Sequence, residues 1–520
     1  MRPQPTRHNV NQEMIMATSA APAAGPSSGA AADPKRWLIL AVVCTAYLMV
    51  GLDLTVMNLA LPSAQEALEF TDADRQWIVT AYALPFGGLL LFFGRLSDLF
   101  GRKETFLIGL TGFAIASAVG GAANSFGMLV TARACQGVFA AMLAPACLAL
   151  LTTTFTDPKE KAKAFGAYSA VAASGTGLGL IIGGVLTDGL SWRWCMYVNL
   201  LFAGVAFVGG IALLHKQPRT GARMDLPGVL LGTGGMFSLV YGFSNAADDS
   251  WSTPGTWGFL ALGGVLLAVF AFWQTRAAQP LLPPRIVLDR NRGGAYLAVL
   301  FVGTGVFGVM LFLIYYMQTD LDYSAIVSGV SLLPLIVLTG VGANVGGVKL
   351  MPKTGPRPLV TAGLLLTAAA MAWLTRIGPD SGYATHLLGP TMVAGLGMGL
   401  IFAAVLRTGT SGVAPEDAGI ASACVNTGQQ IGGAIGVALL NTIAATATTD
   451  WLKSNVQGQP TPEQLSSASI EGYTTVFWWC TAIFAAGAVV SALLLRGGPL
   501  PESEDTLAGS PAEQPETTHS

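Results

Sequence analysis

WLILAVVCTAYLMVGLDLTVMNLAL, residues 37–61, is an apolar run in which Asp53 is the only charged side chain. An α-helix needs about 20 consecutive apolar residues to cross the hydrocarbon core of a bilayer, so this run predicts a transmembrane helix. An ionisable side chain within such a helix is costly and is functional by default. The run therefore predicts both the fold class and a first candidate site residue.

The composition of the whole chain agrees with a membrane location. Of its 520 residues, 52% are hydrophobic and only 11% are charged, and its mean hydropathy is +0.57. Soluble domains carry about 25% charged residues. A hydropathy window of about 20 residues predicts fourteen transmembrane helices. These spans are 37–61, 76–94, 105–123, 126–151, 164–187, 194–214, 226–244, 255–273, 294–317, 324–348, 358–377, 386–406, 417–444 and 473–495.

The basic residues predict how these spans are oriented. With a cytoplasmic N-terminus, only four of the 27 Lys and Arg residues fall in outer segments, namely Arg75, Arg193, Arg376 and Lys453. Arg133 lies within a span, and the other 22 lie in inner segments. Cytoplasmic loops carry an excess of Lys and Arg, so we expect both termini to be cytoplasmic.

The two ends of the chain are expected to be cytoplasmic tails without a fold of their own. Residues 1–36 are rich in Ala, Pro and Ser and lack the apolar core of a cleavable signal peptide, and Met14 or Met16 is an alternative start. Residues 497–520 are acidic and rich in Pro. Six cysteines lie in or beside apolar spans without the spacing of metal ligands, and we interpret them as packing residues.

Two pairs of similar segments indicate an internal repeat. Glycines 175, 179 and 183 recur at 428, 432 and 436, and the loop at 94–103 is similar to the loop at 347–358. Both offsets correspond to eight helices. We therefore predict a six-helix half at 37–214, a linker with two extra helices at 215–290, and a second six-helix half at 291–496. This is the parallel-repeat plan of a transporter.

Four motifs carry a resemblance to a known family. They are LDLTVMNLALP (52–62), GRLSDLFGRK (94–103), LVTARACQGVFAA (129–141) and SWRWCMYVN (191–199). In this order and on these helices they resemble the fourteen-helix drug:proton antiporters of the major facilitator superfamily, the EmrB/QacA type. The resemblance covers all fourteen spans. One departure is Leu180, which stands where the antiporter motif of the family usually has proline.

The resemblance implies that the loop at 94–103 is a conformational switch. Its carboxylate, Asp98, would lie near the N-terminus of a neighbouring helix, where the helix dipole favours negative charge. Gly94 would permit a close helix contact and Gly101 a tight turn, while Arg102 and Lys103 would lie at the cytoplasmic surface. The alternative is that the basic residues are only positive-inside anchors. In the second copy Pro352 stands at the position of Asp98, so only the first copy should switch.

Asp53 and Arg133 are expected to form the proton-coupling site. Asp53 lies about 12 Å below the outer end of its span, and Arg133 lies about 10 Å below the same surface. In the superfamily the first and fourth helices line the central cavity, so the pair would share a polar, partly hydrated space. Desolvation would favour proton binding by Asp53, and the approach of Arg133 would oppose it. The alternatives are an inert ion pair and an arginine that extends to the surface.

The substrate cavity is expected to use amide and aromatic side chains of the cavity helices. These amides have an equally good alternative role as interhelical hydrogen-bonding groups. Cavity helices ten and thirteen carry no acidic residue away from their ends, which favours a neutral, zwitterionic or singly charged lipophilic substrate. The candidates are Asn58, Tyr82, Gln136, Phe301, Gln318, Asn344, Phe402, Asn426, Gln429 and Gln430.

The predicted function is proton-coupled export of amphipathic drugs or natural products across the cytoplasmic membrane by alternating access. The alternative is proton-coupled uptake of a small polar nutrient, because the superfamily fold serves both directions. We do not expect an enzyme, because the chain has only four histidines and shows no arrangement of residues typical of a catalytic nucleophile or a metal site. We expect the proton motive force as energy source, no cofactor or metal, no nucleic acid partner, and a functional monomer.

Overall fold

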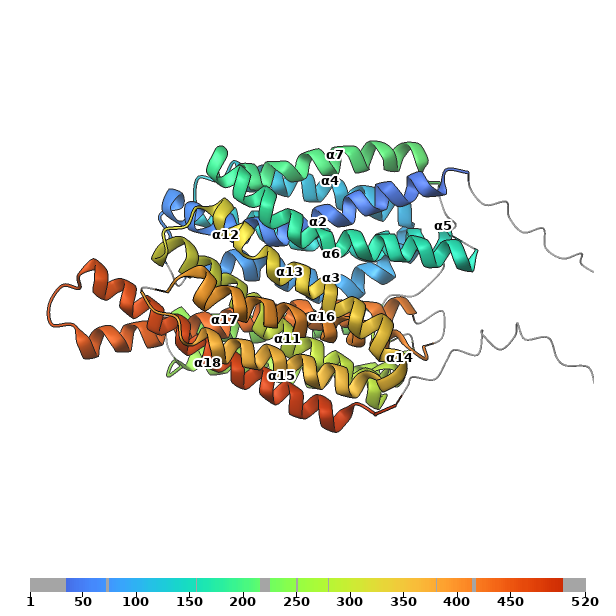
Figure 1. Ribbon diagram of the computed structural model, residues 1–520. Coiled ribbons are helices and arrows are strands. Elements are labelled where there is room, and N and C mark those ends of the chain that lie inside the picture. The colour runs from blue at the N-terminus through green and yellow to red at the C-terminus, as the bar shows by residue number, and fades with distance from the viewer. Residues whose placement is uncertain are drawn as a thin grey trace, which may run out of the picture.

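The computed structural model describes residues 34–71, 74–155, 157–215, 225–248, 251–278, 280–379, 381–413 and 418–498. All regular secondary structure in these ranges is helical, which confirms the predicted all-α class. The predicted tails lie almost entirely outside these ranges, as do Met14, Met16 and the basic residues at 216, 219 and 223. The long helices run alongside one another as a bundle (Figure 1).

The helices are named in chain order. Those before the middle of the chain are α2 (Arg36–Leu68), α3 (Arg75–Phe100), α4 (Arg102–Gly121), α5 (Phe126–Thr154), α6 (Pro158–Gly189), α7 (Trp194–Leu213), α8 (Leu226–Asp248) and α9 (Pro254–Gln274). Those after it are α10 (Pro284–Val287), α11 (Arg290–Tyr315), α12 (Ala325–Ser331), α13 (Leu333–Asn344), α14 (Met351–Thr354), α15 (Pro356–Leu374), α16 (Leu388–Thr410), α17 (Ala418–Asn455) and α18 (Pro462–Leu494). Three π-helical turns are η1 (Tyr316–Asp320), η2 (Val345–Leu350) and η3 (Tyr383–Leu387).

Twelve helical segments in the described ranges are long and apolar enough to cross a membrane. Two further long helices, α3 and α6, have shorter apolar stretches, at Trp77–Leu90 and Gly177–Gly189. Every predicted span overlaps one to three consecutive helical segments, with three (α12, α13 and η2) for the span at 324–348. The count of fourteen spans stays a prediction.

Several helices differ from the predicted spans for identifiable reasons. α2 continues to Leu68 and α18 begins at Pro462, because a helix can extend beyond the hydrocarbon region that a hydropathy window detects. The connection between α17 and α18 projects beyond the rest of the bundle (Figure 1). The span predicted at 324–348 is broken at Leu332, because Pro334 in the first turn of α13 lacks a backbone N–H.

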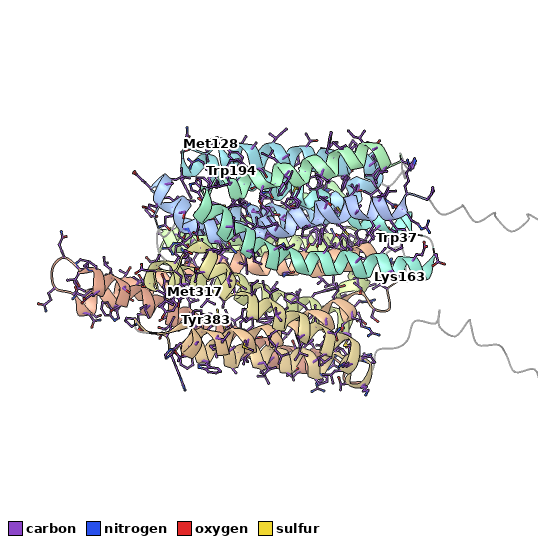
Figure 2. The ribbon with its side chains drawn as sticks, turned by 45° about the horizontal axis from the view of Figure 1, so that its top comes forward. Trp37, Met128, Lys163, Trp194, Met317 and Tyr383 are labelled. Atoms are coloured by element: carbon purple, nitrogen blue, oxygen red, sulfur yellow. The ribbon has the colours of Figure 1, made fainter. Side chains whose placement is uncertain are left out.

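The ends of the helices alternate between two faces of the bundle. Figure 2 shows Trp37 and Lys163 at one end, and Met128, Trp194, Met317 and Tyr383 toward the other. The predicted topology assigns the first two residues to the cytoplasmic side and the other four to the outer side. We call these two ends the inner and outer ends.

The two glycine ladders make equivalent helix contacts. A methyl group at Gly179 or Gly183 of α6 would press against α2, at Thr55 or Val56. A methyl group at Gly432 or Gly436 of α17 would clash with carbonyl oxygens of α11. The absence of side chains therefore lets the backbones approach closely in both places. We use the terms N-terminal group for α2 to α7 and C-terminal group for α11 to α18.

The α8–α9 hairpin lies beside both groups. Thr233 of α8 donates a hydrogen bond to the carbonyl of Gly88 on α3 (3.2 Å). Val240 of α8 is buried in a cluster with Ala83 of α3 and Ala434 of α17. α8 therefore packs where α3 meets α17.

Candidate functional site

Asp53 is the centre of a polar cluster inside the N-terminal group. Its Oδ2 accepts a hydrogen bond from Nη1 of Arg133 at 2.6 Å. Its Oδ1 accepts one from Nε2 of Gln136 at 3.1 Å and one from Nδ2 of Asn199 at 2.6 Å. The Asp53 and Arg133 residues are only 1% and 2% exposed. The predicted pairing of Asp53 with Arg133 is therefore present in the structure.

Arg133 is held on several sides. Besides Asp53, its Nη1 contacts Oε1 of Gln136 at 2.9 Å. Its Nε donates to the carbonyl of Ile78 at 3.3 Å. Its guanidinium carbon lies 4.4 Å from the ring centre of Tyr82, which is a cation–π contact. These contacts exclude the alternative in which Arg133 extends to the membrane surface.

Two members of this cluster were not predicted. Ser117 of α4 accepts hydrogen bonds from Gln136 (2.7 Å) and Asn199 (3.4 Å), and both Ser117 and Asn199 are fully buried. The available signal was the presence of these polar side chains within apolar spans, and Asn199 is the last residue of the motif SWRWCMYVN. The cluster thus joins five helices: α2, α3, α4, α5 and α7.

The cluster is closed to bulk solvent in this conformation, because all five polar side chains are at most 2% exposed. The expected hydration of the space around Asp53 and Arg133 stays a prediction. A buried ion pair that loses one partner is strongly destabilised, by about 3–5 kcal/mol. Protonation of Asp53 would remove the charge that Arg133 needs. Loss of that charge would leave Arg133 buried without its ionic partner, at a point where five helices meet.

The segment predicted as a loop at 94–103 is largely helical, because residues 94–100 belong to α3 and residues 102–103 to α4. Only Gly101 lies between the two helices, and it makes the tight turn that the sequence predicted. Gly101 has a φ of 104°, which favours glycine, and it is the cap residue of both α3 and α4. Arg102 is the first residue of α4. At Gly94 a methyl group would lie 3.7 Å from Pro145, an ordinary contact, so the expected close approach is not seen there. The side chain of Asp98 lies outside the described part of the chain.

Lys103 has a contact that the sequence did not predict. Its Nζ donates to the carbonyl of Ile211 at 3.1 Å and to that of Leu214 at 2.5 Å. Both carbonyls belong to the C-terminal end of α7, where a cation is favoured by the helix dipole. Lys103 therefore joins the start of α4 to the end of α7.

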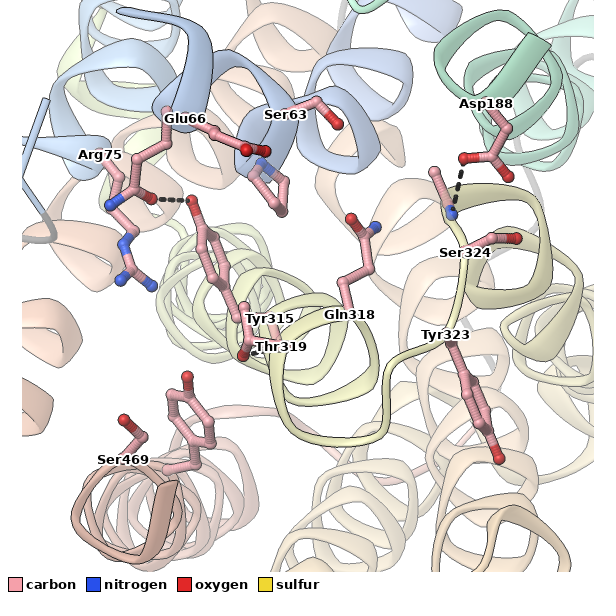
Figure 3. A pocket seen from close by; sticks show the side chains of 14 residues that line it. Ser63, Glu66, Arg75, Asp188, Tyr315, Gln318, Thr319, Tyr323, Ser324 and Ser469 are labelled. Atoms are coloured by element: carbon pink, nitrogen blue, oxygen red, sulfur yellow. Dashed lines mark hydrogen bonds between the residues drawn. The ribbon is translucent and has the colours of Figure 1, made fainter. Parts of the chain in front are cut away.

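A cavity of about 610 Å³ lies between the two groups at the outer end (Figure 3). It is lined on one side by the end of α2, the start of α3 and Asp188 of α6. On the other side are Tyr315, Gln318, the start of α12 and Tyr473 of α18. Its volume lies within the usual range of small-molecule sites, about 300–1,000 Å³.

The predicted substrate residues are only partly brought together. Gln318 lines the outer cavity, and its Nε2 donates to the carbonyl of Leu59 at 3.4 Å. Tyr82 and Gln136 belong to the buried Asp53 cluster rather than to a cavity. Tyr82 lies on α3 and Gln136 on α5, and both side chains are fully buried within the N-terminal group.

The other candidates are scattered over the bundle. Asn344 is exposed at the end of α13, Asn58 and Gln430 are buried, and the rest are half-buried. Phe301 faces Gly487 of α18, and Gln430 faces Gly87 of α3. The half-buried set is Phe301, Phe402, Asn426 and Gln429.

The cysteines are free thiols. Cys147, Cys195, Cys424 and Cys480 are buried and Cys44 is half-buried, as expected of packing residues, but Cys135 is exposed. Within the described ranges, no cluster of three or more His, Cys, Asp or Glu side chains is arranged to bind a metal.

Membrane-length helices, a buried ion pair and a cavity between two groups of helices are the features of a secondary transporter. Residues 43–437 match the Major Facilitator Superfamily. The chain belongs to this superfamily of membrane transporters.

Curated relatives are similar over most of their length. A puromycin resistance protein of Streptomyces alboniger is 46% identical over 467 residues, covering 89% of this chain and 92% of the relative. A cephamycin export protein of Amycolatopsis lactamdurans is 39% identical, covering 79% and 85%. A probable actinorhodin transporter of Streptomyces coelicolor is 34% identical, covering 81% and 75%.

Solved structures share the fold. A bacterial homologue of the human lysosomal transporter Spinster, in an inward-facing and unoccupied conformation, has a TM-score of 0.62 at 17% identity. The match covers 89% of this chain and 97% of that structure. An auto-inhibited peptide transporter of the POT family has a TM-score of 0.63 at 14% identity, with 89% and 96% covered.

Proposed function

We propose that this protein exports amphipathic drugs or natural products across the cell membrane in exchange for protons. The observation that carries the proposal is the buried Asp53–Arg133 pair, whose side chains lie 2.6 Å apart. The relatives named for resistance to puromycin or for export of cephamycin support export as the direction. Each proton that moves down a potential of 100 mV releases about 2.3 kcal/mol, enough for a gradient of roughly fiftyfold.

In this proposal Asp53 carries the proton. When Asp53 is charged, Arg133, Gln136 and Asn199 all donate to its two oxygens. Protonation removes the negative charge and occupies one oxygen with hydrogen, so this set of donors no longer fits. Arg133 must then find other acceptors, and α5 must shift relative to α2. That shift is the proposed link between the proton and alternating access.

The proposed substrate is a lipophilic compound that is neutral, zwitterionic or singly charged. The outer cavity contributes three tyrosines, Tyr315, Tyr323 and Tyr473, and is large enough for a drug-sized molecule. Among the side chains that line it, Arg75 is the basic one, and Glu66 and Asp188 are acidic. This mixture suits an amphipathic compound better than a multivalent ion.

We also propose fourteen spans, both termini in the cytoplasm, and a monomer as the working unit. The excess of Lys and Arg in the predicted inner segments supports the orientation. The shared contacts of the two glycine ladders support two six-helix halves, at 37–214 and 291–496, with the extra hairpin between them.

Inside-out vesicles loaded with acid in their lumen test this function. Addition of an exported compound, such as puromycin, should make the lumen more alkaline, because protons leave as the compound enters. A symporter would change the luminal pH in the opposite direction. Vesicles with Asp53→Asn protein should show no change of luminal pH on addition of the compound. An unchanged luminal pH with wild-type protein across a panel of antibiotics and dyes would contradict the proposal.

A further inference from the structure

Asp188 joins the two groups of helices at the outer end. It lies in the last turn of α6, and its Oδ1 accepts a hydrogen bond from the backbone N–H of Ala325 at 3.0 Å. Its Oδ2 accepts one from the N–H of Ile326 at 2.9 Å. Ala325 and Ile326 are the first two residues of α12, in the other group. Figure 3 shows this contact at the edge of the outer cavity.

The first turn of α12 depends on this carboxylate. The first N–H groups of an α-helix have no partner within the helix. Ser324 caps α12 by accepting a hydrogen bond from Val327 at 3.4 Å. Asp188 accepts hydrogen bonds from the two residues that precede Val327, namely Ala325 and Ile326. One group of helices therefore completes the cap of a helix in the other.

The backbones of α6 and α12 also meet beside this carboxylate. A methyl group at Gly184 would clash with Ile326, and one at Gly329 would clash with the carbonyl of Leu180. The backbones of the two helices are therefore in direct contact at these two glycines. Any opening of the outer end along this seam must separate Asp188 from α12.

The charge of Asp188 is matched to α12 and mismatched to its own helix. A carboxylate is favoured at the positive N-terminal end of a helix and disfavoured at the negative C-terminal end. Asp188 lies at the C-terminal end of α6 and faces the N-terminal end of α12. The contact with α12 therefore compensates a charge that α6 alone would oppose.

We propose that Asp188 is an external gate residue, whose carboxylate holds α12 against α6 and so closes that side of the outer cavity. The inference rests on the proposed function, because alternating access requires an external gate that opens in every cycle. On the opposite side of the cavity, Arg75 lies 3.8 Å from the ring centre of Tyr315, and Tyr315 donates to Gln65 at 3.0 Å. Asp188 closes the side formed by α6 and α12.

The test measures access to the cavity from outside. Ser469 lines the cavity and is half-buried, so Ser469→Cys is a reporter for a membrane-impermeant maleimide in intact cells. Asp188→Asn removes the charge and one of the two acceptors. We expect the labelling rate to rise by about tenfold, the effect of losing roughly one charge-assisted hydrogen bond. Glu66→Gln is the matched control, since Glu66 lines the same cavity and has no described hydrogen bond to α12.

A second variant changes the other partner. Ala325→Pro removes one donor, and proline is favoured at the first position of a helix. The preceding Ser324 already has an extended backbone, with φ of −64° and ψ of 161°, as a residue before proline requires. This variant should also raise labelling. Combined with Asp188→Asn it should add less than it does alone, because both changes break the same contact.

The outcomes separate the gate from the proposed function. Faster labelling in Asp188→Asn and Ala325→Pro, with Glu66→Gln like wild type, supports the gate. Export should then show a higher KM at the inner side, because fewer molecules face inward. Unchanged labelling in both folded variants, or an equal rise in Glu66→Gln, would overturn the gate. If the wild type shows no proton exchange, the proposed function is wrong. The labelling experiment still tests the gate in that case, because it requires no substrate.

Discussion

Asn199 Nδ2 lies 2.6 Å from Asp53 Oδ1, although the two residues are 146 positions apart in the chain. Asp53 lies on α2 and Asn199 on α7, and both are buried. Arg133 holds the other oxygen of the same carboxylate. The carboxylate is thus fixed from two directions, and its orientation depends on α7 as much as on α5.

Replacing Asn199 should therefore weaken transport through Asp53. Asn199→Ala removes one donor to a charged group, and we expect a loss of roughly tenfold in kcat/KM for export. In the Asp53→Asn background the same change should have little further effect on proton exchange, because the two residues act as a unit. Thr45→Ala is the control, because Thr45 lies on α2 like Asp53 and its described hydrogen bond goes to the carbonyl of Ala41 in the same helix. Equal losses in both alanine variants would argue against the role of Asn199.

The pairing of Asp53 with Arg133 could be predicted from the sequence because it depends on how far each residue lies below the outer end of its span. Each residue interrupts an apolar span, and counting from the helix ends places both at the same level. Asn199 and Ser117 could not be predicted in the same way. Their contacts depend on the rotation of α7 and α4 about their axes, which the short apolar spans leave undetermined.

The residues that line the outer cavity could not be predicted from the sequence pattern either. Its lining comes from helix ends such as those of Tyr315 and Asp188, where span boundaries are least certain. The fold could be predicted more fully, because the lengths of the apolar runs predict the helices and the two glycine ladders predict some of their contacts. The break at Leu332 is the exception, and Pro334 was the signal for it.

Lys103 should contribute to stability at the inner end. Lys103→Gln removes a cation from the last carbonyls of α7, and we expect a loss of about 0.5–2 kcal/mol in the free energy of unfolding. Lys353→Gln is the control, because Lys353 is exposed at the end of α14. Thermal unfolding of the purified variants measures the difference. Equal melting temperatures for the two variants would show that the contacts of Lys103 contribute nothing.

Asp225 should anchor the α8–α9 hairpin. Its carboxylate accepts hydrogen bonds from Gly228 N–H at 3.0 Å, from Nε1 of Trp273 at 2.7 Å and from Nε2 of Gln274 at 3.0 Å. Asp225→Ala leaves these donors without partners and should cost about 2 kcal/mol or more. Asp289→Ala, which removes a single exposed cap of α11, should cost about 1 kcal/mol. Limited proteolysis and thermal unfolding would detect the difference, and a reversed order would contradict it.

The predicted orientation can be tested by cysteine labelling. In a background with Cys135 replaced by serine, cysteines at Lys163 and Lys353 should react only after the membrane is permeabilised. Cysteines at Asp450 and Ser466 should react in intact cells, because the orientation set by the excess of Lys and Arg in inner segments places both positions outside. All four positions lie outside the predicted spans, and Ser466 Oγ bonds to Asp320 at 2.7 Å. A reactive Lys163 position in intact cells would overturn the orientation.

Asp53→Asn is the most direct test of proton coupling. The change keeps the size of the side chain and one acceptor oxygen but leaves no group that can bind a proton at this position. Proton-driven export should be lost, while the substrate should still bind, because the variant resembles protonated Asp53. Substrate affinity in this variant should no longer respond to protonation at this position, and affinity measured at several pH values for wild type and variant would show the difference.

The same change leaves Arg133 without its charged partner, and an unpaired buried charge can cost about 3–5 kcal/mol. Folded yield and thermal unfolding must therefore be measured first. The double variant Asp53→Asn with Arg133→Gln removes both charges and should recover part of any lost stability without restoring export. Affinity and substrate-induced proton release should then be measured on the same purified protein. Proton release with the pH dependence of the wild type would show that Asp53 is structural, and that another residue carries the proton.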